Sequence, residues 1–376
     1  MRTAVLRQPR RLGSVCRVAP APWALTDDQR NLYIASQRFA RNRLEPLLAG
    51  APSVAAWQET VRLAAATLDL GAMVLPEEHG GLGIDRHGLA LVVEALAAGP
   101  LERALELTLT APTLMVLRMH NALGPVLARP VQAYFDGTTA IALSVPSIDN
   151  ATIWQLGPLG GAGILTARID AKRRLLLTER PHDQRPSRST GIATLGTLVL
   201  EQLHSDEAAA ETPLAVIARA DSDSVPPAQK YMTEIGLYLA ALLTGAMQHS
   251  VRFAFDYATT RQAFRKPLAS HQLVAARLSD MLIVTHGTHL FLQAVRTARP
   301  SAPVPLVRQL LRHVAAESVS VSREFVQLCG GHGYVEGLPP AARFQTGHWF
   351  AFLLQRIDTA LGWLAEPQMA NEEVDG

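Results

Sequence analysis

The chain has 376 residues, of which 48% are hydrophobic and 18% are charged, and 35 Lys and Arg residues nearly balance 33 Asp and Glu residues. This composition supplies enough apolar surface for a folded core and excludes a mainly disordered chain. The net charge of +2 provides no broad positive field, so we expect no nucleic-acid partner. Two cysteines, Cys16 and Cys329, are too few for a disulfide framework, which favours a reducing compartment.

Residues 1–25 form an arginine-rich extension that we set apart from the folded chain. This stretch contains five arginines and no acidic residue, a composition that also occurs in organelle transit peptides. We expect a bacterial cytoplasmic protein with a loose extension, and mitochondrial import is the alternative. The longest dense apolar run, residues 237–247, is shorter than the roughly 20 residues that cross a bilayer, so we expect no membrane span.

The first folded region, residues 26–130, is predicted to be a layer of helices. Thr26 is suited to cap a helix whose first turn contains Asp27 and Asp28, where carboxylates complement the helix dipole. Apolar residues then recur with helical spacing as far as about residue 48. Similar patterns predict helices over 54–70, 89–98 and 101–117, and a turn-rich loop over 76–83.

The pattern changes after Pro130, where short apolar segments are bounded by Gly and Pro. We predict strands over 140–145, 164–169, 174–178 and 195–200. Short strands without long helices between them favour a small antiparallel barrel or sandwich over residues 131–226.

From residue 227 to residue 376 the pattern is helical again, with long helices predicted over 230–259, 271–299 and 306–328. The expected fold class is therefore α+β, with an N-terminal helical domain, a middle β domain and a C-terminal domain of the four-helix-bundle type.

This order of domains, together with three motifs, resembles the acyl-CoA dehydrogenase family over nearly the whole chain after residue 26. The loop PEEHGGLG at 76–83 is similar to the family's PEExGGxG. Residues 257–272, YATTRQAFRKPLASHQ, resemble the family's YxxxRxxFGxx[IL]xxxQ, and LSDM at 278–281 resembles its downstream ADM. Residues 327–334, QLCGGHGY, resemble the family's QxxGGxG[FY].

The resemblance implies a bound FAD, because in this family the last two motifs hold the adenine and pyrophosphate end of the FAD in the neighbouring subunit. The implied cofactor-binding residues are Arg261, Phe264, Gln272, Gln327, Gly330 and Gly331. A guanidinium offers a forked cation to a pyrophosphate, and glycine amides allow close approach because no Cβ intervenes. The simpler interpretations are a solvated arginine at a helix end, a core phenylalanine and a glycine helix cap.

The chain departs from the family at the catalytic base, a carboxylate that removes the α-proton of the acyl thioester. Counting from residues 327–333 puts the usual site near Leu354. Counting back from Arg261 puts the alternative site near Ile235, beside Glu234, with Gly236 where a CoA-contacting arginine is usual. A one-residue offset turns a helical side chain by about 100°. We assign no catalytic residue: Glu234 is either a displaced base or a solvated helix carboxylate.

Two further regions bear on the site. In the middle domain, Ser144-Val145-Pro146 matches the family's flavin-contacting TEP segment only in part, and its WI[TS] strand is absent between residues 173 and 199. His286 and His289 lie three residues apart with no third ligand nearby in the sequence, so we expect surface or interface histidines and no metal site.

The residues that a subunit lends to its neighbour's FAD are therefore present, and those that serve its own flavin ring and proton abstraction are missing. This profile resembles the degenerate, non-catalytic subunit of heteromeric bacterial acyl-CoA dehydrogenases, such as those of steroid side-chain catabolism. The resemblance implies an α2β2 heterotetramer in lipid metabolism, in which a second, catalytic chain supplies the base and binds most of the acyl-CoA. The alternatives are a self-sufficient homo-oligomeric dehydrogenase with Glu234 as base, a flavin-dependent monooxygenase of the same fold, and a scaffold without flavin.

Overall fold

The computed structural model describes residues 25–366, except for 129–131, 137–139, 148–151, 159–163, 180–189, 205–211, 218–224, 299–300 and 336. The arginine-rich extension therefore lies almost wholly outside the described residues. In the described part, no helix is long and apolar enough to cross a membrane.

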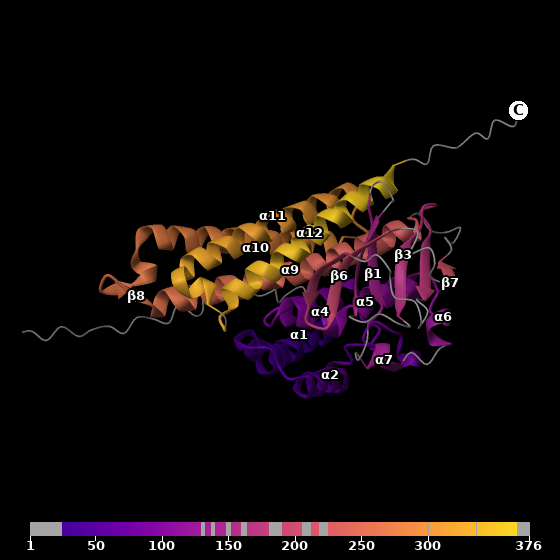
Figure 1. Cartoon of the computed structure of the whole chain (residues 1–376), viewed down its shortest axis with the longest axis horizontal. Helices are drawn as coiled ribbons and strands as arrows, with labels where there is room; N and C mark the ends of the chain where they lie inside the picture. The colour runs from indigo at the N-terminus through magenta and orange to yellow at the C-terminus, as the bar shows by residue number, and fades with distance from the viewer. Residues whose placement is uncertain are drawn as a thin grey trace, which may run out of the picture.

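The N-terminal part is a layer of helices, drawn in indigo and purple in Figure 1. Thr26 and Gln29 form a capping box that begins the first helix, as the sequence predicted for Thr26. The α-helix ends at Phe39, and a π-helical turn and a 3-10 helix follow it as far as Ala49. The helices are α1 Asp27–Phe39, α2 Val54–Leu68, α3 Arg86–Leu96, α4 Leu101–Thr108, α5 Thr110–Met119 and the short α6 Gly124–Leu127 and α7 Gln132–Phe135.

The middle part is a single seven-stranded sheet in the order β5-β6-β2-β1-β3-β4-β7. The strands are β1 Ala142–Pro146, β2 Thr152–Pro158, β3 Leu165–Ile169, β4 Leu175–Glu179, β5 Thr190–Leu195, β6 Leu198–His204 and β7 Thr212–Ile217. A middle β domain is thus confirmed, but the described strands form an open sheet whose edges are β5 and β7.

Two expectations about the strands were wrong. The sheet is not wholly antiparallel, because β3 enters it beside β1, whose direction it shares, instead of beside β2. The strand predicted over 195–200 is interrupted by a hairpin turn: Gly196 has φ +65° and reverses the chain, so Leu195 ends β5 and Leu198 begins β6. The apolar residues on both sides of this turn gave it the pattern of a single strand.

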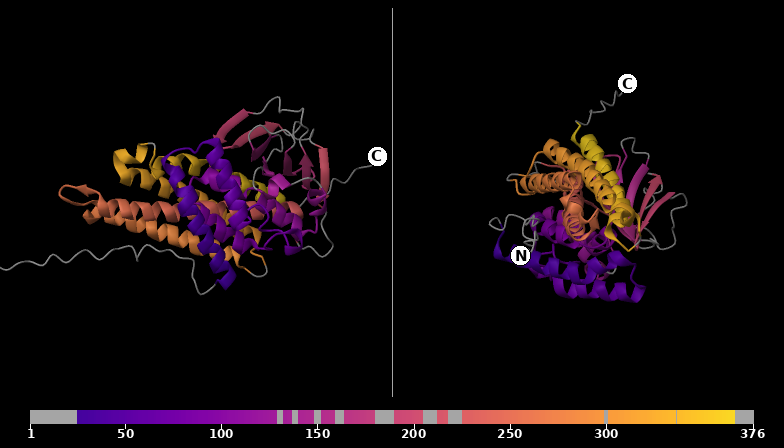
Figure 2. Two further views of the ribbon diagram at one scale, coloured as in Figure 1. Left: turned by 90° about the horizontal axis from the view of Figure 1, so that it is seen from below. Right: turned by 90° about the vertical axis from the view of Figure 1, so that its left-hand side faces the viewer.

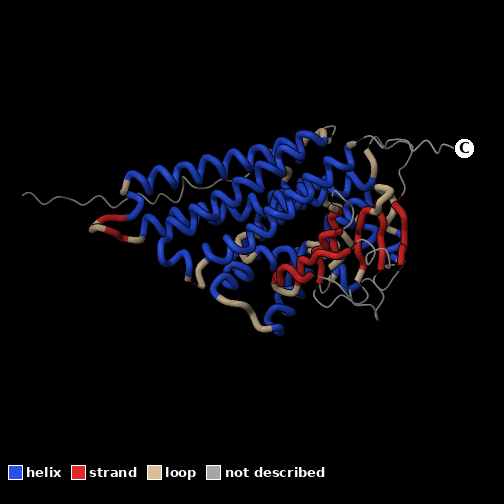
Figure 3. Tube along the Cα trace, turned by 45° about the horizontal axis from the view of Figure 1, so that its top comes forward, coloured by secondary structure: helices blue, strands red, loops and turns tan. Residues whose placement is uncertain are grey.

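The C-terminal part is a bundle of four long helices, α9 Pro227–Thr260, α10 Gln272–Arg296, α11 Val304–Cys329 and α12 Pro339–Ala365, which lie side by side in Figures 1, 2 and 3. A small hairpin, β8 Gln262–Ala263 and β9 Lys266–Pro267, joins α9 to α10 at the end of the bundle farthest from the sheet. Near its start, α9 contacts the sheet, where the Tyr231 hydroxyl donates to the Ala167 carbonyl at 3.0 Å. Arg261 at the other end of α9 is about 45 Å from Tyr231 at 1.5 Å per residue.

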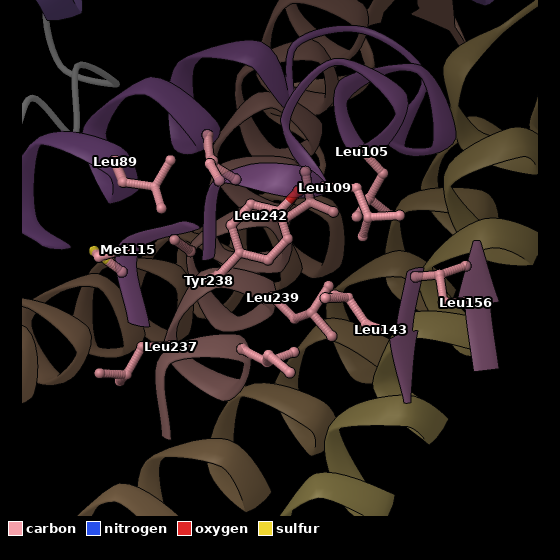
Figure 4. Packing of buried hydrophobic residues seen from close by; sticks show 14 of the residues in the cluster. Leu89, Leu105, Leu109, Met115, Leu143, Leu156, Leu237, Tyr238, Leu239 and Leu242 are labelled. Carbon is pink, nitrogen blue, oxygen red and sulfur yellow. The ribbon is translucent and has the colours of Figure 1, made fainter. Parts of the chain in front are cut away.

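Helix α9 is the centre of the core, and its side chains meet the N-terminal helices on one side and the sheet on the other. Figure 4 shows this packing around Tyr238, Leu239 and Leu242 of α9, with Leu89, Leu105, Leu109, Met115, Leu143 and Leu156. The Tyr238 hydroxyl lies 2.7 Å from that of Thr108, so its polar atom is satisfied inside the core. Beyond Met247, a second apolar cluster fills the outer half of the bundle as far as Cys329.

Candidate functional site

The first set of expected cofactor residues lies on the hairpin end of the bundle. Arg261 is the C-cap of α9, Phe264 lies at the tip of the β8–β9 hairpin, and Gln272 begins α10. All three are exposed, and Phe264 keeps 91% of its surface accessible. The interpretation of Phe264 as a core residue is therefore wrong, whereas Arg261 does stand at an exposed helix end.

The second set lies where α11 ends. Gly330 is the C-cap of α11 and has φ +57° and ψ −134°, a backbone conformation that a side chain would strain. A Cβ added to Gly330 or Gly331 would meet no atom within 4 Å, so the space beside this backbone is open, and the Gly330 N–H donates to the Gln327 carbonyl. Gln327 is exposed and donates from Nε2 to the Tyr334 hydroxyl at 3.3 Å.

Tyr257 brings these two sets together. Its hydroxyl donates to the Cys329 carbonyl at 3.2 Å and lies 2.9 Å from Nδ1 of His332. These contacts join the end of α9 to residues 330–334, which we call the glycine loop. Burial raises the pKa of the Tyr257 phenol, and the nearby charge of Arg261 opposes that shift. The result is one exposed surface at the far end of the bundle, with a guanidinium, an apolar ring and a glycine backbone that no side chain covers. This chemistry fits the pyrophosphate and adenine of a dinucleotide.

Glu234, the weak candidate for the catalytic base, lies deep in the core. Its side chain is fully buried, and both carboxylate oxygens accept hydrogen bonds from Arg86 of α3, with Nε 2.7 Å from Oε2. The interpretation as a solvated helix carboxylate is therefore wrong. The two residues are 148 positions apart, so no local spacing in the sequence could reveal the pair.

A small pocket adjoins this ion pair, lined by Arg86, Leu89, Met115, Glu234, Tyr238 and Arg296 among others. Its free space holds about one water molecule and not an acyl chain. Since Arg86 occupies the oxygens of Glu234, this carboxylate is held away from any substrate proton in this arrangement.

The other expected base position is equally closed. Leu354 is fully buried in the interior of α12, which continues for 27 residues without a break. The carboxylate of this helix is Asp358, one turn further on, and it accepts from Arg308 at 2.7 Å and from Arg312 at 2.8 Å. The carboxylates nearest to the two expected base positions, Glu234 and Asp358, are thus both paired with arginines.

The Ser144 segment, which matches the family's flavin-contacting segment only in part, is packed into the fold. Ser144 is buried in β1 and donates from its hydroxyl to the Ala167 carbonyl at 3.0 Å. Trp154 of β2 packs edge-to-face on Phe352 of α12 with ring centroids 4.7 Å apart. Aromatic side chains therefore meet where the sheet approaches α12.

The expectation that His289 is a surface or interface residue was wrong, whereas His286 is exposed. His289 is 1% exposed, and its Nδ1 lies 3.0 Å from Oε2 of Glu94, which also accepts from Arg296. Burial alone would raise the pKa of Glu94, but Arg296 and His289 outweigh it and hold that pKa below its usual value. Among the described residues, no group of three His, Cys, Asp or Glu side chains could hold a metal ion.

Comparisons with known proteins bear on this arrangement. A model of the acyl-CoA dehydrogenase N-terminal domain matches residues 26–124, and a model of the C-terminal domain of the same enzymes matches residues 228–350. The short-chain specific acyl-CoA dehydrogenase of Megasphaera elsdenii is 29% identical over 105 residues, which are 27% of this chain and 27% of that protein. The match thus spans about a quarter of that relative.

A longer match is to acyl-CoA dehydrogenase IpdE2 of Mycobacterium tuberculosis, which is 24% identical over 295 residues, or 78% of this chain and 81% of that protein. Among solved structures, a glutaryl-CoA dehydrogenase from Mycobacterium smegmatis in complex with FADH2 has a TM-score of 0.63 and 15% identity. That similarity covers 89% of this chain and 95% of the other, and it shows a shared fold.

Proposed function

Because this chain belongs to the acyl-CoA dehydrogenase family, we propose that it is a subunit of an FAD-dependent enzyme that desaturates a CoA thioester between its α and β carbons. In this proposal the chain is the non-catalytic subunit of an α2β2 heterotetramer, and a second chain supplies the base and binds most of the acyl-CoA. One observation carries the proposal: the motif residues are exposed together at one end of the bundle, while the carboxylates near both base positions are paired with arginines.

The position of the motif residues supports a cofactor shared between subunits. Leu239 of α9 packs near Leu143 of the sheet (Figure 4), and Arg261 lies 22 residues, or about 33 Å, further along the helix. In this proposal, a cofactor held at the hairpin has its flavin ring in another chain. The glutaryl-CoA dehydrogenase of the same fold was solved with FADH2, which is consistent with FAD as the cofactor here.

When bound, FAD accepts the hydride that leaves the β-carbon of the acyl group. The residues of this chain would bind and orient it: Arg261 would hold the pyrophosphate, and the open backbone of Gly330 and Gly331 would let its oxygens or the adenine approach closely. Phe264 supplies an apolar face, and Gln272 and Gln327 supply neutral hydrogen-bonding groups. The proton of the α-carbon is taken by a carboxylate of the partner.

The alternative functions of this fold require different residues. A self-sufficient dehydrogenase would have to release Glu234 from Arg86, and a monooxygenase would need no such base. Retention of Arg261 and the glycine loop favours FAD over both a freely diffusing reduced flavin and a scaffold without flavin. A bulky CoA ester of steroid side-chain breakdown is the substrate class of the heteromeric enzymes that this chain resembles.

Turnover of the assembled complex tests whether Glu234 is a base. We expect the double variant Arg86→Met/Glu234→Leu to retain turnover within a few-fold, because it removes the charged pair together and leaves the partner's base intact. A true general base contributes on the order of 100-fold or more. A loss of that size in a complex that keeps its FAD would move the active site onto this chain.

A further inference from the structure

We propose that Arg265, at the tip of the β8–β9 hairpin, is a second phosphate-binding residue for an adenosine pyrophosphate group held at the subunit interface. This inference rests on the proposed function, because it places a nucleotide at the hairpin end of the bundle. It concerns a departure from the family pattern, since glycine is usual where this chain has Arg265.

The hairpin tip has an unfavourable backbone for its residues. Phe264 and Arg265 have φ +52° and φ +66°, and they are the two central residues of the turn between Ala263 and Lys266. Two-residue turns with both φ values positive strongly favour Asn-Gly, because glycine avoids the steric cost of this region. Strained residues of this kind are concentrated at functional sites.

A second arginine of the chain has the same kind of backbone conformation but makes side-chain contacts in its own chain. Arg173 also has a positive φ, +59°, but its guanidinium donates to the Glu366 carbonyl at 2.6 Å and lies 4.8 Å from the ring centre of Trp363. Arg265 is exposed and makes no hydrogen bond or ion pair with any residue that the structure describes. Its guanidinium therefore has no hydrogen-bond or ion-pair partner within the described part of its own chain.

The charges around Arg265 favour an anion with several negative oxygens. Arg261, Arg265 and Lys266 lie within six residues of one another, and all three are exposed. No Asp or Glu occurs between residues 257 and 279, and none of the three cations pairs with a described carboxylate. A guanidinium beside a second cation matches a pyrophosphate, whose oxygens accept bidentate hydrogen bonds.

Two molecules of the proposed reaction carry an adenosine pyrophosphate: FAD and the CoA part of the substrate. The shared chemistry is the same, so separate titrations with FAD and with CoA distinguish them. The protein to use is the complex of this chain with its dehydrogenase partner, freed of flavin. The variants are Arg265→Gly and Arg265→Asn, because both residues accept a positive φ while removing the charge. Arg38→Gln, at an exposed site on α1, controls for the loss of one positive charge.

We expect both Arg265 variants to bind one of the two nucleotides at least about tenfold more weakly, the usual effect of losing a hydrogen bond to a charged group. Arg265→Gly should at the same time raise the thermal unfolding midpoint, because it relieves the turn. Arg38→Gln should change neither affinity. Weaker binding of FAD alone assigns Arg265 to the cofactor, and weaker binding of CoA alone assigns it to the substrate.

Unchanged affinity for both nucleotides in Arg265→Gly and Arg265→Asn would overturn this inference and leave the proposed function standing. A wild-type complex that binds neither FAD nor CoA would overturn the proposed function, and the inference with it. The gain in unfolding midpoint is a separate readout, because an arginine that only stabilised the fold would lower the midpoint when replaced.

Discussion

Replacing one member of the buried Arg86–Glu234 pair should lower the free energy of unfolding by about 3–5 kcal/mol, the usual cost of leaving a buried charge without its partner. Arg86→Met leaves the fully buried Glu234 carboxylate without its partner, and Glu234→Leu leaves the Arg86 guanidinium without its partner. Denaturant unfolding of each single variant and of wild type measures the loss.

The double variant Arg86→Met/Glu234→Leu is the informative companion, because it removes both charges together. We expect it to lie within about 1–2 kcal/mol of wild type or above it, since apolar replacements of a buried pair are often neutral or stabilising. Arg62→Met is a matched control on α2: its pair with Glu59 is just as short, at 2.7 Å, but exposed to water, so its loss should lower stability far less than either single variant of the buried pair. A double variant as unstable as the sum of the two singles would contradict the ion-pair account.

Arg261→Ala should weaken FAD retention in the assembled complex by about 1.5–3 kcal/mol, the usual worth of a hydrogen bond to a charged group. The physical reason is that Arg261 is exposed at the end of α9 and has no partner among the described residues that would be lost instead. Titration of FAD into the deflavinated complex gives the two affinities directly.

The control for this prediction is Arg261→Lys, which keeps the charge but loses the planar fork and should recover only part of the affinity. If Arg261 is no more than a solvated arginine at a helix end, neither change alters flavin content and stability shifts by less than about 0.5 kcal/mol. Equal FAD affinities for wild type and Arg261→Ala would therefore leave this residue without a role in binding.

Much of the fold could be predicted from local signals. Thr26 with its following carboxylates predicted the start of α1, and the long helical periodicity predicted the bundle. The strands were harder: β2 was not predicted, although Thr152, Ile153 and Trp154 are of the residue types enriched in strands. The Gly196 turn was mistaken for part of a strand because apolar residues flank it on both sides, at Leu195 and Leu198.

Part of the candidate site could be predicted from the sequence and part could not. Exposed motif residues such as Arg261 and Gly330 carry signals in short segments, so the sequence alone could point to them. The partners of Glu234 and Glu94 could not be predicted, because Arg86 and Arg296 are 148 and 202 positions away and only the packing of α3 against α9 and α10 brings them together. A buried carboxylate and a solvated one look alike in a sequence until the opposing arginine is known.

The proposed function requires that this chain lends its FAD-binding residues to a partner. Flavin absorbance in the visible region tests this directly, with the chain purified alone and then co-expressed with acyl-CoA dehydrogenase chains of the same genome. We expect the chain alone to be colourless or poorly soluble, and the complex to be yellow, because the exposed surface around Arg261 and Gly330 is only part of a site. A stoichiometric yellow complex formed by this chain without a partner would contradict the claim.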